Sequence, residues 1–241
     1  MAVSRLFSVL AAAAVLSGCA AMPDTSAVEK ISPIRAVSSA LDTRTTARNF
    51  ISVVEDVEPI AERECRARAP SLNCDFRIVV DDRAGMPPNA FQTLDDSGRP
   101  VVAFTLSLIA DARNKDELAF VLSHEAAHHI QGHLDRQRQN ADAGAIVFGQ
   151  LAGALGARTP AELRAAQEIG AAVGARSYSK AFELEADTLG TLIAKEAGFD
   201  PLVGAEFFFR IPEPSDAFLS THPPNEERVA NVRRTVARLG R

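Results

Sequence analysis

Four of the five histidines in this 241-residue chain lie within one short segment, LAFVLSHEAAHHIQGH, at residues 118–133. Glu125 lies among them, and most of the other residues of the segment are apolar. Moving a polar side chain out of water costs several kcal/mol unless the group finds a partner. Histidines gathered in an apolar segment therefore need either solvent or a shared partner, and a metal ion would be such a partner.

The segment contains the pattern His-Glu-x-x-His at residues 124–128. Residues four apart on a helix share a face, with Cβ atoms roughly 5–6 Å apart, so His124 and His128 can bind one Zn²⁺ at about 2.0–2.1 Å. Glu125 would follow about 100° around the helix, where it can hold a water molecule instead of the ion. The pattern therefore predicts one Zn²⁺ per chain, with Glu125 as a general base in hydrolysis.

His129 and His133 are also four residues apart and form a competing pair. No glutamate occupies the second position of this pair, and on one continuous helix it would point about 140° away from His124. We therefore interpret both as residues that either lie just outside the ligand shell or are partly exposed near the end of the helix, and of these we favour ordinary surface histidines with satisfied partners.

A catalytic zinc needs a third protein ligand and an open coordination position. A second helical segment, SKAFELEAD, places Glu183 and Asp187 four residues apart and hence on one face. Glutamates on helices are commonly solvated, but the shared face with Asp187 weakens that interpretation for Glu183. Glu185 lies off this face, and we expect it to be solvated.

The HEAAH and ELEAD segments together resemble the zinc metallopeptidases of the HtpX, Oma-type and CAAX-prenyl-protease family, whose third ligand is the glutamate of an ExxAD motif. The resemblance covers roughly residues 45–235. It implies that Glu183 is the third zinc ligand. It also implies that Asp187 orients a zinc-bound histidine by accepting its other N–H.

The segment STHPPNEER, at residues 220–228, resembles the C-terminal histidine–proline and arginine element of the same family. The resemblance implies that His222 and Arg228 lie near the metal. His222 would either stabilise the oxyanion of the tetrahedral intermediate or occupy the open coordination position as an inhibitory ligand. The sequence leaves both roles open.

The same resemblance implies an α+β, mainly α-helical, zincin-like metallopeptidase domain, with a small edge sheet or hairpin packed on the HExxH helix. The implied activity is that of an endopeptidase for misfolded or misassembled envelope proteins, with the substrate extended along the edge strand near Phe91. Two other classes remain as alternatives. One is a chaperone-like periplasmic lipoprotein with a structural zinc, and the other is a membrane-anchored scaffold without metal.

Apolar spacing and turn residues predict the elements that position these side chains. Before the site we expect an amphipathic helix over about 45–67, a strand over 76–80, a hairpin of 89–91 with 101–106, and the HExxH helix over 115–134. After it we expect a close-packed helical hairpin within 141–176, a helix over 179–198, a short helix from 201, and a last helix over about 225–239. Asn114 with Glu117 would form a capping box for the HExxH helix, and Asp200 would cap the short helix.

The first residues have the features of a leader. Arg5 precedes an apolar run and the sequence LSGC, which resembles the lipobox of bacterial lipoproteins. This predicts a signal peptide over 1–18, a lipidated Cys19 with a tether over 19–43, and the metallopeptidase domain over 44–241. Ala20 after the cysteine resembles lipoproteins of the outer membrane, so we expect a lipid anchor there and a domain that faces the periplasm.

Two cysteines remain, Cys65 and Cys74, nine positions apart. In an oxidising periplasm they predict a disulfide, with two unlinked thiols as the alternative. The chain has a net charge of −5, no basic tract, no tryptophan and a single tyrosine, which argues against nucleic-acid binding. The expected partners are therefore unfolded or misassembled protein substrates, and the oligomeric state stays open.

Overall fold

The computed structural model describes residues 33–177, 179–210 and 225–240. The chain divides into two compact units, residues 1–38 and 39–241, and the account that follows concerns the second. The elements in chain order are α1 (Pro33–Arg68), β1 (Arg77–Asp81), β2 (Ala90–Leu94), β3 (Pro100–Thr105), α2 (Leu106–Asp111), α3 (Lys115–Ile130), α4 (His133–Ala154), α5 (Pro160–Ser177), α6 (Ser179–Glu196), α7 (Pro201–Gly204), a 3₁₀ helix (Ala205–Phe209) and α8 (Asn225–Leu239). The expected fold class, mainly helical with a small sheet, is confirmed.

The sheet has three strands in the order β1-β3-β2. β1 pairs in parallel with β3, and β2 pairs antiparallel with β3, which confirms the expected hairpin. Asp95 closes the hairpin turn, because its side chain accepts hydrogen bonds from the backbone N–H groups of Ser97 and Arg99. Among the described residues only β3 pairs with β2, so β2 is an edge strand with one side left for another partner.

Helix α3 carries the HExxH pattern and is buried around most of its circumference. Its expected start is confirmed. Asn114 accepts a hydrogen bond from the Glu117 N–H, and the Glu117 carboxylate accepts one from the N–H of Arg113. These contacts satisfy backbone donors that a helix start leaves without intrahelical partners. Capping and burial together hold α3 as the central element of the unit.

The end of α3 differs from the expectation. The helix was predicted to continue to about residue 134, but it ends at Ile130, and α4 begins at His133. Gly132 takes the left-handed conformation, with φ of 66°, which a residue without a side chain adopts at little cost. The chain therefore changes direction between His129 and His133, and the two histidines do not belong to one continuous helix.

The first helix also differs from the expectation. It was predicted over about 45–67, yet α1 covers Pro33–Arg68, so the expected tether of residues 19–43 overlaps a helix from Pro33 onward. From residue 42 onward, where burial is described, the first buried apolar side chain is Phe50, and residues 42–46 are mostly exposed. The early part of α1 therefore lacks the apolar periodicity from which the prediction was made, and Pro33 suits a first helical position.

A disulfide joins Cys65 near the end of α1 to Cys74 ahead of β1. Both cysteines are buried in the hydrophobic core, beside Phe76 and the inner face of α1. The bridge therefore attaches the long first helix to the sheet at the point where the chain enters it.

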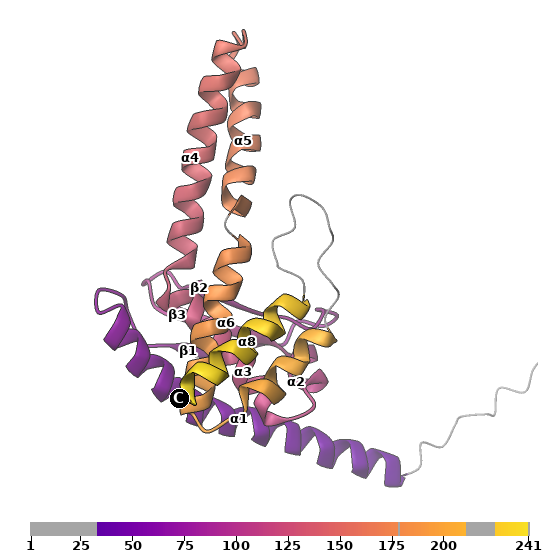
Figure 1. Ribbon diagram of the computed structural model, residues 1–241. Coiled ribbons are helices and arrows are strands. Elements are labelled where there is room, and N and C mark those ends of the chain that lie inside the picture. Colours follow the sequence, from indigo (N-terminus) through magenta and orange to yellow (C-terminus); the bar gives the residue numbers. More distant parts are fainter. Residues whose placement is uncertain (1–32, 178, 211–224, 241) are drawn as a thin grey trace, which may run out of the picture. The chain divides into compact units, whose positions relative to one another are not determined.

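The expected helical hairpin is confirmed as α4 and α5, which run side by side in Figure 1. Their backbones approach closely at Gly144 and Gly170, where an added Cβ would overlap the carbonyl group of the facing glycine. No described helix, these two included, is long and apolar enough to cross a membrane. The later elements also match the prediction, because Asp200 caps α7 and α8 covers Asn225–Leu239.

Helix α6 packs directly against α3 at the residues of the candidate site. A Cβ added to Gly190 would lie 3.0 Å from the backbone nitrogen and the Cα of His124. A side chain at Gly190 would therefore push against the backbone of His124, which would have to shift to admit it. The close approach at Gly190 sets the distance between the helix that carries the HExxH pattern and the helix that carries Glu183.

We expect Gly190→Val to lower the free energy of unfolding by about 1–3 kcal/mol, the usual cost of overpacking. The matched control is Gly153→Val in α4, where an added Cβ meets only a leucine side chain at 3.9 Å. The control should stay within about 0.5 kcal/mol of the parent protein. Urea unfolding of both variants tests this, and equal stabilities would contradict the close packing of α6 on α3.

Candidate metal centre

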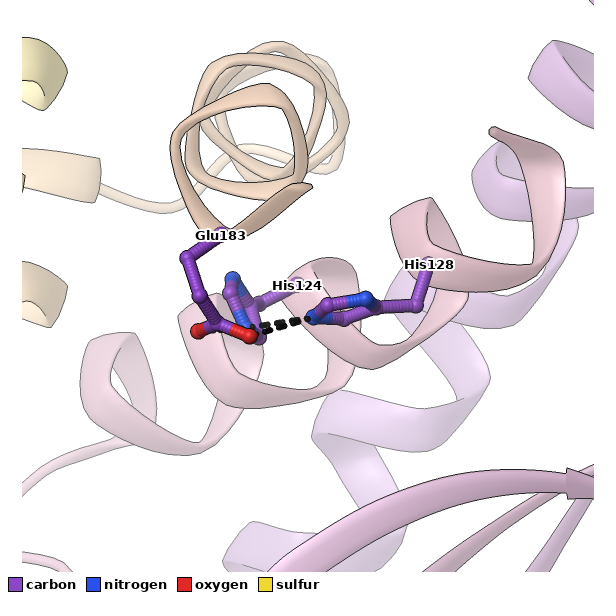
Figure 2. A group of neighbouring side chains, drawn as sticks. All are labelled: His124, His128 and Glu183. Atoms are coloured by element: carbon purple, nitrogen blue, oxygen red, sulfur yellow. Dashed lines mark hydrogen bonds and ion pairs between the residues drawn. The ribbon is translucent and has the colours of Figure 1, made fainter. Parts of the chain in front are cut away.

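The side chains of His124, His128 and Glu183 converge on one point between α3 and α6 (Figure 2). The Nε2 atoms of the two histidines lie 3.0 Å apart. The carboxylate oxygens of Glu183 lie 3.5 Å from Nε2 of His124 and 3.4 Å from Nε2 of His128. Each side chain therefore turns one potential ligand atom toward the same small volume.

The chemistry of these donors fits a metal ion. Two imidazole nitrogens and one carboxylate are a donor set that catalytic zinc sites use. Burial lowers the pKa of His124, but its contacts with Asp187 and Glu183 outweigh this effect and raise the pKa to about 9. The two carboxylates thus favour positive charge at this point. Burial together with the charge of His124 lowers the pKa of His128 well below its usual value, which favours the neutral imidazole that a metal ligand needs.

Two further buried side chains, Asp187 and Arg228, support His124 on the Nδ1 side of its ring. Its Nδ1 lies 3.0 Å from the Asp187 carboxylate. Arg228 of α8 donates to both oxygens of Asp187, at 2.9 and 2.7 Å, and its guanidinium lies over the ring of Phe208. The structure thus places Asp187 and Arg228 where the resemblance implied. An Nδ1–H directed at Asp187 leaves Nε2 of His124 free to bind a metal.

Glu125 lies next to this group and faces an open cleft of about 620 Å³. The cleft is lined by residues 88–92, which include the start of the edge strand, and also by Phe207 and Phe208. Burial raises the pKa of Glu125, and although the charge of His124 acts against this, the pKa reaches about 7. A carboxyl group with such a pKa can both accept and release a proton near neutral pH.

His129 and His133 are both buried, which corrects the prediction that they are partly exposed. Nε2 of His129 lies 2.7 Å from the carbonyl oxygen of Asn73, so this histidine has a satisfied partner, as expected. His133 instead contacts a candidate ligand, because its Nδ1 lies 2.8 Å from Nδ1 of His128. The error came from treating residues 115–134 as one helix. Gly132 was the signal in the sequence that could have indicated the break.

Glu185 was expected to be solvated. Its side chain is 39% exposed, which agrees with this expectation, and it also lies 3.2 Å from Nε2 of His133 and 2.5 Å from the guanidinium of Arg136. Two other residues named in the sequence analysis, His222 and Cys19, lie outside the described residues.

Comparison with known proteins places this geometry in a family. Residues 48–236 match peptidase family M48. The chain is 32% identical to the beta-barrel assembly-enhancing protease of Escherichia coli K12 over 227 residues, which is 80% of this chain and 46% of that protein. The protein of the same name from Shigella flexneri gives the same values. That from Yersinia pestis is 30% identical over 132 residues, or 50% of this chain and 27% of the relative.

The chain thus spans less than half the length of these curated relatives. The family match itself covers most of the chain. It includes α3, α6 and most of α8, the helices that bring the candidate ligands, Asp187 and Arg228 together. This chain belongs to peptidase family M48.

Proposed function

We propose that this chain is a zinc-dependent endopeptidase, in which His124, His128 and Glu183 bind one zinc ion and Glu125 is the general base. The observation that carries the proposal is the convergence of three metal-binding side chains beside a carboxyl group whose pKa lies near 7, at the wall of an open cleft. A purely structural zinc would have no use for that carboxyl group.

A zinc ion held by these three residues would supply a Lewis acid that polarises a peptide carbonyl and lowers the pKa of water toward about 7. Glu125 accepts the proton of the attacking water and delivers it to the nitrogen of the leaving amine. Asp187 keeps the ring of His124 in the orientation in which Nε2 faces the centre, and Arg228 holds Asp187 in place.

The cleft suits an extended peptide. Residues of the edge strand β2 line it, and an extended chain can add to such an edge through backbone hydrogen bonds. Apolar side chains line the cleft nearby, among them Phe91 on the edge strand, Phe207 and Phe208. We therefore infer that the enzyme cleaves unfolded segments and accepts apolar side chains next to the cleaved bond.

The names of the relatives point to the assembly of β-barrel proteins. We propose that this chain acts on misfolded or misassembled envelope proteins. We further propose that it faces the periplasm and is anchored to the outer membrane through a lipid on Cys19. The disulfide between Cys65 and Cys74 supports an oxidising compartment, because such bonds persist in the periplasm and are rare in the cytosol.

The metal ligands can be tested by elemental analysis of purified protein after dialysis. We expect one zinc per chain in the parent protein and loss of most of it in His124→Ala, His128→Ala and Glu183→Ala, because each change leaves only two protein ligands. Glu168→Ala, at an exposed position of α5, is the control and should retain zinc. Full zinc content in Glu183→Ala would show that the third ligand is wrongly assigned.

The general base can be tested by Glu125→Gln, which keeps the shape of the side chain but cannot accept a proton. Because general-base catalysis is typically worth about 10²–10⁴ in rate, cleavage of unfolded casein should fall by that factor. Zinc content and melting temperature should stay close to those of the parent protein. A Glu125→Gln protein as active as the parent would remove the enzymatic mechanism and leave a structural zinc as the better interpretation.

The anchor can be tested by Cys19→Ser in cells supplied with a labelled fatty acid. The parent protein should incorporate the label and fractionate with membranes, because a cysteine that ends a lipobox becomes the lipidated residue. Cys19→Ser should take up no label. Ala20→Ser is the matched control and should be labelled normally. Equal labelling of the Cys19→Ser protein would contradict the anchor.

A further inference from the structure

His133, the first residue of α4, is buried between the candidate metal centre and α6. On one side its Nδ1 lies 2.8 Å from Nδ1 of His128. On the other side its Nε2 lies 3.2 Å from the Glu185 carboxylate. Its ring stacks on Phe182 with the centroids 4.6 Å apart and the planes 10° from parallel. The ring of His133 is therefore held in one orientation, with each nitrogen facing a different group.

The hydrogen positions in this chain of contacts follow from the role of His128. Its Nε2 faces His124 and Glu183, so that nitrogen must be unprotonated to bind a metal, and the ring hydrogen must be on Nδ1. This Nδ1–H then donates to Nδ1 of His133, which must act as the acceptor. The ring hydrogen of His133 is consequently on Nε2, from which it donates to Glu185. This single assignment of ring hydrogens gives a partner to all four ring nitrogens of His128 and His133.

The two histidine ligands are thus supported in parallel ways. His124 donates directly to Asp187, a buried carboxylate held by Arg228. His128 reaches Glu185 through the ring of His133, and Glu185 is paired with an arginine as well, Arg136 of α4, at 2.5 and 3.3 Å. The guanidinium of Arg136 in turn lies 4.2 Å from the centre of the Phe182 ring. Each histidine ligand is therefore linked by hydrogen bonds to a carboxylate, and each of these carboxylates is paired with an arginine.

We propose that His133 is a positioning residue of the metal centre. It orients the ring of His128, and through its hydrogen bonds it lets the Glu185 carboxylate polarise that ring. The proposal rests on the proposed function for the ligand role of His128. A hydrogen bond from the distal ring nitrogen fixes the tautomer and the angle of a metal-binding imidazole and increases its basicity. Without His133, the ring of His128 would rotate more freely and bind the ion less tightly.

The decisive measurement is the zinc affinity of the full-length protein, obtained by competition with a chromogenic chelator. His133→Phe keeps a ring that can stack on Phe182 but has no nitrogen, and we expect its affinity to fall about 10- to 100-fold. His133→Asn places an amide oxygen near the position of Nδ1, so it should accept from His128 and recover much of the loss. This rescue would not occur if His133 only filled space.

The matched control is His129→Phe. His129 is also buried and also hydrogen-bonded, but its partner is the Asn73 carbonyl and not a metal ligand. We expect this variant to lose stability without losing zinc affinity. The visible absorption bands of bound Co²⁺ give a second readout, since they report the ligand geometry. They should shift in His133→Phe and stay unchanged in His129→Phe.

Zinc affinity within twofold of the parent protein in His133→Phe, with unchanged Co²⁺ bands, would overturn the proposal. If His133→Phe does not fold, Glu185→Gln decides instead, because it keeps an acceptor for His133 but removes the charge. Its affinity should fall by less than that expected for His133→Phe, and no fall would overturn the proposal. Zinc retained in His128→Ala would instead contradict the proposed function, so the two failures are distinguishable.

Discussion

The packing of α6 on α3 is the contact on which the rest of the site depends. It buries Asp187 completely, and a buried carboxylate is strongly unfavourable unless it is paired and hydrogen-bonded. His124 and Arg228 provide that pairing, and they come from α3 and α8. The same contact carries Glu183 to the two histidines. The absence of a side chain at Gly190 permits this approach, so stability and the assembly of the site share one requirement.

The candidate centre is consequently held from several elements at once. α3 contributes His124 and His128, α6 contributes the carboxylates, and α8 and α4 contribute the two arginines that hold those carboxylates. Ligands supported in this way lose few degrees of freedom when a metal binds, because their rings are already oriented. The cleft that the centre itself lines has a different character away from the ligands. It is bounded by an edge strand and by phenylalanines, which suits a substrate that is extended and in part apolar.

Several parts of the fold could be predicted from the sequence because their signals are local. The caps at Asn114 and Asp200, the hairpin around Asp95 and the last helix were expected where they occur. The start of α1 was wrong by more than ten residues, since the sequence ahead of Phe50 has no apolar periodicity from which a helix could be predicted. The predicted end of α3 was wrong because the helical spacing of apolar residues continues in the sequence past Gly132, where the helix has already ended.

The sequence by itself determined that two histidines and a glutamate share one turn of a buried helix, and that Glu183 and Asp187 share a face of another. Both facts depend only on helical spacing, which is the same in any tertiary context. Only the tertiary structure decided which groups support the ligands. The helix ends before Gly132, so helical spacing no longer predicts where the side chains after this glycine point. The contact of His133 with His128 could therefore not be predicted from a helical wheel. Arg228 is distant in the sequence from Asp187, and it meets the site in the fold, where the buried carboxylate requires a counter-charge. Arg136 is likewise distant from Glu185, and the two pair at a partly exposed position.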